Sequence, residues 1–282
     1  MKASWRRREA ILSLSMSPTL KTGNAGRKTV YLIGGTTEAN RAAVRLEKTG
    51  YRVLVSVASP LGEAMARAGS VDAGAKDADA MAAAAGSAGA AAILDCSHPY
   101  AAKATSEAQR AAGLAGVPYL RLARPFSPAV PGAIYVDSWQ EAVSILADAG
   151  AEAPPRRALL AIGTRNLRHF ALAGGCRPDF AVRVLPVPES LDECHRLGVP
   201  PRDIIAACPP HSTDFNRACL RHAGARILVT KDTGAEGGLA EKIEAARLED
   251  SLVLIIRRPP EPVGAFYDLD GALAQLRKVL KG

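Results

Sequence analysis

The chain has 282 residues, 48% of them apolar, and a mean hydropathy of +0.02, as expected for a globular protein of one large or two medium domains. Its net charge is +8, but residues 1–28 hold seven lysines and arginines against one glutamate, a charge of +6 that leaves +2 for the rest. So small a charge on the body gives little support to a nucleic-acid surface. The uncharged run Ala80–Leu94 is too short to span a membrane, so neither nucleic acid nor a membrane is expected as a partner.

Residues 1–28, which begin MKASWRRREAILSLSMSP, are expected to form a disordered basic tail. Their apolar stretch Ala10–Leu14 is shorter than the core of a signal peptide and no cleavage-like site follows, so targeting is disfavoured and Met16 is an alternative start. The five cysteines are scattered and odd in number. They do not suggest a disulfide framework, and a reducing cytoplasm is the expected location.

One cysteine pattern could in principle hold zinc. Cys208-x-x-His211 and Cys219-x-x-His222 together offer four ligands. The first pair follows a strand-like run, the second lies in an expected helix, and nothing in the sequence forces them together. We therefore favour two partly buried thiols and two surface imidazoles, with no metal.

From Val30 onward, strand-like apolar runs alternate with helix-like stretches, which is typical of βα units and a parallel sheet. In the first half the predicted strands are residues 30–33, 53–57, 92–95, 119–122 and 134–136. The predicted helices lie near residues 38–49, 78–85, 101–115 and 139–149.

The segment GAEAPPRR, residues 150–157, interrupts this pattern with two prolines and is the expected linker. The second half then repeats the pattern, with strands at 158–162, 181–185, 204–207, 227–230 and 252–257 and helices near 166–173, 190–197, 213–222, 238–247 and 271–280. We predict an α/β protein with two Rossmann-like parallel-sheet domains, residues 29–150 and 158–282. A ligand should lie in the cleft between them, at the carboxyl ends of the strands.

The first predicted strand ends in a glycine pair and runs directly into a helix, in the sequence TVYLIGGTTEANR. The residues of this turn are Gly34, Gly35, Thr36, Thr37 and Glu38. Backbone N–H groups at the positive end of a helix dipole favour a phosphate, so we predict that this turn holds a dinucleotide. Thr36 stands where the fingerprint G-x-G-x-x-G has its second glycine, and a plain tight turn is the alternative.

The second predicted strand ends VSVASPLG and offers Ser59 but no carboxylate. NAD sites usually present an acidic side chain there to the ribose 2′-hydroxyl. Its absence removes the repulsion of a 2′-phosphate, so this strand end fits NADP better than NAD.

A third polar strand end, ILDCSHPYAAK, contributes Ser97, His98 and Tyr100 beside a proline that stops the strand. The spacing Tyr100-x-x-Lys103 is one residue shorter than the Tyr-x-x-x-Lys pair of short-chain dehydrogenases, which argues against that family. A capped turn with a hydrogen-bonded histidine is the structural alternative.

Two turns in the second half carry cations. One places Arg165 and Asn166 at a helix start, and the other places Lys231 and Asp232 before a glycine-rich loop. N–H groups with a guanidinium can bind an anion, although a neighbouring lysine and aspartate are more often a solvated pair. The two turns together predict a ligand with several negative charges.

Five stretches resemble, in the same order, the precorrin-6A reductase family of corrin biosynthesis: LIGGTTEANR, DCSHPYAAKATSEAQRAAGLAGVPYLRLARP, IGTRNL, RVLPVPESL and VTKDTGAEGGLAEKIEAAR. They cover nearly everything from Val30 to Pro259. The segment CPPHST, residues 208–213, departs from the Gly-Pro-Phe-Ser-like turn usual in that family, and nothing in the family resembles residues 1–28.

The resemblance implies NADPH-dependent reduction of one double bond in the ring-D region of a tetrapyrrole, either metal-free or carrying cobalt. The candidate proton donors are His98, Tyr100 and Lys231, with solvent as an alternative. The substrate carboxylates are expected on the second-half turns, at Arg165, Asn166, Lys231 and Asp232, and NADPH on the first turn together with Ser59 and Ser97. Another NADP-dependent reductase, a methyltransferase with the same layers and an NADPH-sensing regulator remain alternatives.

Overall fold

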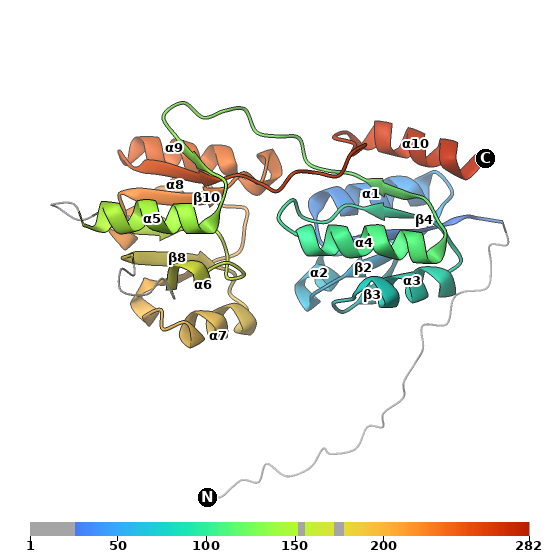
Figure 1. Cartoon of the computed structure of the whole chain (residues 1–282), viewed down its shortest axis with the longest axis horizontal. Coiled ribbons are helices and arrows are strands. Elements are labelled where there is room, and N and C mark those ends of the chain that lie inside the picture. Colours follow the sequence, from blue (N-terminus) through green and yellow to red (C-terminus); the bar gives the residue numbers. More distant parts are fainter. Residues whose placement is uncertain (1–25, 152–155, 172–177, 282) are drawn as a thin grey trace, which may run out of the picture.

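The computed structural model describes residues 26–151, 156–171 and 178–281 and has two lobes side by side (Figure 1). Each lobe is a parallel β-sheet with helices on both faces, so the predicted Rossmann-like α/β class is confirmed. No helix within these ranges is long and apolar enough to cross a membrane.

The first sheet has the strand order β3-β2-β1-β4-β5. The order in which strands are added reverses between β1 and β4, which is the topological switch point of this sheet. Its strands are β1 (Thr29–Ile33), β2 (Arg52–Val57), β3 (Ser70–Ala73), β4 (Ala90–Asp95) and β5 (Tyr119–Arg121). One face packs on α1 (Thr37–Lys48) and α10 (Leu269–Lys281), the other on α3 (Ala78–Ser87) and α4 (Ala102–Ala115), while α2 (Pro60–Met65) follows β2. Because both faces are covered, β1 is apolar and buried along nearly its whole length.

The second sheet has the order β6-β11-β10-β7-β8-β9, with its switch point between β7 and β10. Its strands are β6 (Ile134–Val136), β7 (Ala158–Leu160), β8 (Phe180–Val184), β9 (Ile204–Ala206), β10 (Ile227–Lys231) and β11 (Leu252–Ile256). One face is covered by α5 (Trp139–Gly150), α6 (Arg168–Ala171) and α7 (Pro188–Arg196), and the other by α8 (Thr213–Ala223) and α9 (Leu239–Leu248). Two short 3₁₀ helices, η1 (Pro201–Asp203) and η2 (Ala235–Gly237), complete this lobe.

The two sheets do not divide the chain at the expected linker. β6 pairs with β11, and α5 packs on the same sheet, so both belong to the second lobe rather than to residues 29–150. The proline-rich segment therefore connects two elements of one lobe, α5 and β7, although its residues 152–155 lie outside the described ranges, as does most of the predicted tail. A strand of three residues carries no sequence signal for which sheet it joins, and that is why the boundary was misplaced.

The last helix also lies in a different lobe from the one that its position in the chain suggests. α10 returns to the first lobe, where Ala272, Leu273, Leu276 and Leu280 enter its core. The chain thus crosses between the lobes twice, through an outgoing connector, residues 122–133, and a returning connector, residues 257–268. The connectors meet where the Ala123 N–H donates to the Phe266 carbonyl at 2.8 Å, and the Phe266 N–H donates to Arg121, also at 2.8 Å.

The other predicted elements agree with the structure to within a few residues, except that the helix expected at 166–173 is short and partly outside the described ranges. Two elements were not predicted, α2 and β3. β3 is an edge strand of four residues, Ser-Val-Asp-Ala, in which none is fully buried. An edge strand of this kind lacks both the alternating and the continuous apolar pattern by which strands are recognised.

Short polar side chains and glycines set the helix ends. Thr36, Asp77, Ser138 and Ser212 each accept a hydrogen bond from a backbone N–H in the first turn of the helix that follows. At the other end, α4 and α8 stop at glycines with positive φ, Gly116 and Gly224, at 65° and 60°.

We predict that Leu276→Ala destabilises the protein by about 2–5 kcal/mol, because Leu276 is fully buried between α10 and the first sheet. The matched control is Leu248→Ala at the end of α9, where the side chain is 42% exposed and the change should stay within about 0.5 kcal/mol. Urea unfolding followed by circular dichroism measures both. Equal effects of the two substitutions would contradict the packing of α10 on the first lobe.

Candidate functional site

The turn after β1 combines a close backbone approach with free N–H groups. Gly34 is packed against β2, so that an added Cβ would lie 2.5 Å from a methyl carbon of Val55. Gly35 has a φ of +88° with open space around it. The backbone N–H groups of residues 35–38 have no acceptor within the described ranges. They lie at the N-terminus of the twelve-residue helix α1, an arrangement that can bind a phosphate.

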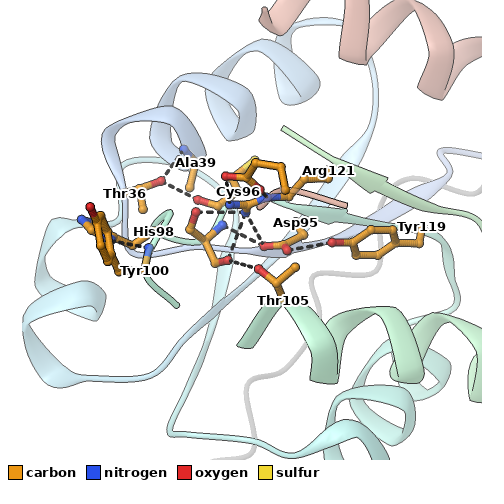
Figure 2. Close-up of polar contacts among 11 residues, drawn as sticks. Thr36, Ala39, Asp95, Cys96, His98, Tyr100, Thr105, Tyr119 and Arg121 are labelled. Carbon is orange, nitrogen blue, oxygen red and sulfur yellow. Dashed lines mark hydrogen bonds and ion pairs between the residues drawn. The ribbon is translucent and has the colours of Figure 1, made fainter. Parts of the chain in front are cut away.

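Two side chains of this turn have structural partners. The Thr36 hydroxyl accepts the Ala39 N–H at 3.1 Å and donates to the Cys96 carbonyl at 2.8 Å, which ties the first turn to the end of β4 (Figure 2). The Glu38 carboxylate pairs with Arg124 of the outgoing connector, at 2.7 and 2.9 Å. For Thr36 and Glu38 the group open to a ligand is therefore the backbone N–H, while the exposed Thr37 hydroxyl is free to add to it.

The end of β2 lies beside β1 in the same sheet. Ser59 caps α2 by accepting the Gly62 N–H at 3.2 Å, and its side chain is exposed. No carboxylate stands between the end of β2 and Ser59, as the sequence indicates.

Buried charges fix the turn after β4. Asp95 is fully buried and pairs with Arg121 at 3.1 Å, while Arg121 also holds Glu261 of the returning connector at 2.8 Å. The Ser97 hydroxyl accepts a hydrogen bond from Arg121 at 3.0 Å and lies 3.1 Å from the Thr105 hydroxyl. Figure 2 shows Arg121 and Tyr119 both directed at Asp95. Ser97 thus belongs to a network that orients the turn.

His98 follows this network and is half-buried. Its Nδ1 accepts the Tyr100 N–H at 3.2 Å, which leaves Nε2 to carry the proton of the neutral ring. Burial, followed by the charges of Lys231, Arg124, Arg165 and Arg121, lowers the pKa of His98 to about 3. The imidazole is therefore neutral at pH 7 and lies near cations from both lobes and the outgoing connector.

Tyr100 joins the two lobes. Its hydroxyl donates to the carbonyl of Ile256, at the end of β11, and accepts the Asp232 N–H, after β10, at 2.9 Å. Burial raises the pKa of Tyr100 well above its usual value. A phenol with both positions occupied serves better to hold the strand ends together than to release a proton.

Two predicted residues of the second lobe meet at its switch point. Lys231 ends β10 and Arg165 follows β7, the neighbouring strand. Burial and then the charge of Arg165 lower the pKa of Lys231 to about 8. Within the described ranges neither side chain makes an ion pair, although the Lys231 Nζ lies 5.2 Å from the centre of the Tyr100 ring. These cations are available to a ligand.

The other two predicted residues differ in availability. The Asp232 carboxylate accepts from Arg258 of the returning connector at 3.2 Å and from the Gly234 N–H at 3.3 Å, so it supports the interface. The Asn166 side chain is half-buried and has no hydrogen-bond partner within the described ranges.

The sequence reasoning missed several buried cations around this region. Arg121, Arg124 and Arg258 hold the lobes together, and Arg183 and Lys242 lie in the second lobe with 6% and 8% of their surfaces exposed. The one available signal is a charged residue inside an apolar strand, as in Phe-Ala-Val-Arg-Val for Arg183. Such a position is buried on either face of a doubly covered parallel sheet, so the charge must find a partner.

A cavity of about 720 Å³ lies beside the junction of the lobes. It is bordered by α1, α9 and both connectors, with Arg41, Phe126, Ile243 and Tyr267 among its lining residues. His98, Lys231 and Arg165 do not line it, so this cavity is adjacent to the strand-end cations rather than formed by them.

The carboxyl ends of both sheets therefore meet, with an N–H-lined turn on one side and unpaired cations on the other. This arrangement defines a two-lobed, Rossmann-like α/β protein whose strand ends face each other at the junction of the lobes. Residues 29–277 match the family model described as Precorrin-6x reductase CbiJ/CobK. The chain belongs to this family, whose members are oxidoreductases.

Individual relatives cover both lobes. A cobalt-precorrin-6A reductase of Methanothermobacter thermautotrophicus is 31% identical over 265 residues, which are 90% of this chain and 85% of that protein. A precorrin-6A reductase of Rhodococcus erythropolis is 31% identical over 87% of this chain and 96% of that one. The solved structure of CobK precorrin-6A reductase aligns with a TM-score of 0.70 at 25% identity, over 89% of this chain and 96% of that chain.

We predict that Tyr100→Phe lowers the free energy of unfolding by about 1–2 kcal/mol, because it removes two hydrogen bonds between the lobes. We do not expect Tyr100 to be the proton donor, so the reductase rate constant kcat should fall only slightly. Loss of a proton donor would instead lower kcat by about 10²–10⁴-fold. The control is Tyr51→Phe, whose hydroxyl has no partner among the described residues. Thermal melting and steady-state kinetics measure the effects. A collapse of kcat with normal stability would instead make Tyr100 the proton donor.

Proposed function

We propose that the protein takes hydride from NADPH bound at the first turn and delivers it to a tetrapyrrole held at the second-lobe strand ends. Its family makes it a precorrin-6A reductase, an oxidoreductase of cobalamin biosynthesis that uses a reduced cofactor. The observation that carries the proposal is the family match across residues 29–277, which includes both strand-end regions. The substrate class is precorrin-6A, with or without cobalt, since relatives of both names match the chain.

The residues of the first lobe fit a dinucleotide. The N–H groups of residues 35–38 would hold the pyrophosphate, and the open space at Gly35 lets it approach the backbone. The end of β2 offers Ser59 without a carboxylate, which favours the 2′-phosphate of NADPH over the free hydroxyl of NADH. When bound, the cofactor supplies a hydride to the acceptor carbon.

We predict that Ser59→Asp weakens NADPH binding at least tenfold while changing NADH binding much less, because the new carboxylate repels a 2′-phosphate. Aspartate is as good a helix cap as serine, so α2 should keep its first turn. Ser138→Asp, which replaces the equivalent cap of α5, is the control for the added charge. Fluorescence titrations with each nucleotide measure the effect. A wild type that binds NADH as tightly as NADPH would overturn the choice of cofactor.

The second lobe fits the substrate end. A corrin precursor carries several acetate and propionate groups, and Arg165 and Lys231 are cations without ion-pair partners among the described residues. A charge-assisted hydrogen bond contributes about 1.5–3 kcal/mol, so each anchor is worth roughly ten- to a hundredfold in binding.

Reduction of a double bond also needs a proton on the second carbon. Among the candidates, His98 has a pKa of about 3 and is already neutral at pH 7, and the Tyr100 hydroxyl is engaged in two hydrogen bonds. The Lys231 ammonium, with a pKa of about 8, is still mainly protonated at pH 7 and near the value that suits a general acid. Lys231 is therefore the proposed donor, and water restores its proton after each turnover.

We predict that Arg165→Met raises the substrate KM roughly ten- to a hundredfold with little change in kcat, while Lys231→Met lowers kcat as well. In the wild type, kcat/KM should fall as the pH rises through about 8, because Lys231 loses its proton there. This fall should persist in Arg165→Met and disappear in Lys231→Met. NADPH affinity should stay within about twofold of wild type in both variants, since neither residue lies on the first turn.

The direct test follows NADPH absorbance during incubation with precorrin-6A and, separately, with its cobalt complex. If NADPH is consumed and one of the two compounds is reduced, the proposal is supported. The compound that is reduced then shows whether the substrate is metal-free or carries cobalt. Tight NADPH binding without reduction of either would favour a nucleotide sensor instead. If Arg165→Met and Lys231→Met both behave like wild type, the substrate does not lie at these strand ends.

A further inference from the structure

A buried arginine in the second lobe has no counter-ion. Arg183 lies within β8 and has 6% of its surface exposed. Its Nη1 donates to the Asn216 amide oxygen at 2.7 Å and lies 3.9 Å from the Cys219 sulfur. Neither partner is a carboxylate, and within the described residues no ion pair neutralises the guanidinium charge. Burial accordingly lowers the pKa of Arg183.

A buried lysine lies near this arginine. Lys242 is on α9, has 8% of its surface exposed and donates from Nζ to the Gly237 carbonyl at 2.8 Å. Burial, then the charges of Arg183 and Lys231, lower the pKa of Lys242 to about 7, against a smaller opposite effect of Glu241. Within the described residues neither Lys242 nor Arg183 makes an ion pair.

Two further groups border this pair. His211, in the loop before α8, is half-buried, and burial followed by the charges of Arg183 and Lys242 lowers its pKa to about 4. Asn216 fixes the loop relative to Arg183, because its amide nitrogen donates to the Ser212 carbonyl at 2.8 Å. Half-buried Lys231, at the end of β10, is close enough for its charge to lower the pKa of Lys242. Cations from β8, β10 and α9 thus influence one another, and within the described residues none of the three makes an ion pair with a carboxylate.

We infer that Arg183 and Lys242, which are more buried than Lys231, form a carboxylate subsite for one acidic side chain of the tetrapyrrole. Two buried like charges are strongly unfavourable unless an anion joins them. The inference rests on the proposed function for the source of that anion. An acetate or propionate group of the tetrapyrrole would supply this anion, whereas the dinucleotide turn lies in the other lobe.

The subsite predicts opposite effects of one substitution on stability and on binding. Lys242→Met removes a buried charge that makes no ion pair within the described residues, so the melting temperature should rise. The folded-state pKa of Lys242 lies below the unfolded value, so the charge destabilises the fold increasingly as pH falls from about 10 to about 7. The gain should therefore be larger at pH 6.5 than at pH 9.5. His211, Arg183, Lys231 and Glu241 are the other titratable or charged groups facing it.

The same substitution should raise the precorrin-6A KM at least tenfold and leave NADPH affinity within twofold. Binding of uroporphyrin, a stable tetrapyrrole with acetate and propionate groups, gives a readout independent of turnover and should weaken by a similar factor, as measured by fluorescence quenching. Lys242→Arg, which keeps the charge, should bind more tightly than Lys242→Met. Lys278→Met on the exposed side of α10 is the control for losing one positive charge.

The outcomes separate this inference from the proposed function. A wild type that reduces precorrin-6A while Lys242→Met keeps its KM and its uroporphyrin affinity overturns the subsite and leaves the function standing. A wild type that binds uroporphyrin in a Lys242-dependent manner without reducing precorrin-6A keeps the subsite and overturns the function. A loss of NADPH affinity in Lys242→Met would assign the anion to the cofactor and overturn the inference.

Discussion

A buried positive charge is unfavourable unless an anion accompanies it, and the distribution of such pairs determines how this protein is built. Three arginines from β5 and the connectors, Arg121, Arg124 and Arg258, pair with buried or half-buried carboxylates, including Asp95 and Glu38. These pairs fix the strand ends of the two sheets relative to each other. The nearby carboxylates are taken up in this way, and within the described residues Arg165, Lys231, Arg183 and Lys242 make no ion pair. These are the cations that we propose to bind an acidic ligand.

The interface has consequences for the chemistry as well as for the architecture. The Tyr100 hydroxyl binds backbone groups at the ends of β10 and β11, and Arg258 binds carbonyls of the outgoing connector. These contacts hold the first turn and the second-lobe cations at a set separation. Reaction between two bound molecules depends on such positioning, which replaces a bimolecular encounter with a fixed geometry. The desolvation that keeps His98 neutral also lowers the pKa of Lys231 to about 8, so burial leaves two neighbouring groups in different protonation states at pH 7.

Much of this could be predicted from the sequence, because the signals were local. The apolar run of β1, the glycine pair at Gly34 and the alternation of strands and helices led to the Rossmann-like class. Sheet membership could not be predicted in the same way, since the three-residue strand β6 and the amphipathic α10 fit either lobe by pattern alone. The sequence also did not show which predicted site residues have side chains free to bind a ligand. Thr36, Glu38 and Asp232 look like ligand-binding groups in sequence, and distant partners along the chain occupy their side chains.

The exchange of elements between the lobes also governs how the chain can assemble during synthesis. The core of the first lobe joins residues near position 30 to residues near position 280, so its last layer is delivered only after residues 269–281 have left the ribosome. The second lobe, by contrast, is continuous from β6 to β11 and can close earlier. Because long-range contacts form slowly, the N-terminal sheet spends this interval with one apolar face covered only in part, by α1. Folding order in this protein therefore runs against chain order, and the lobe that is translated first is completed last.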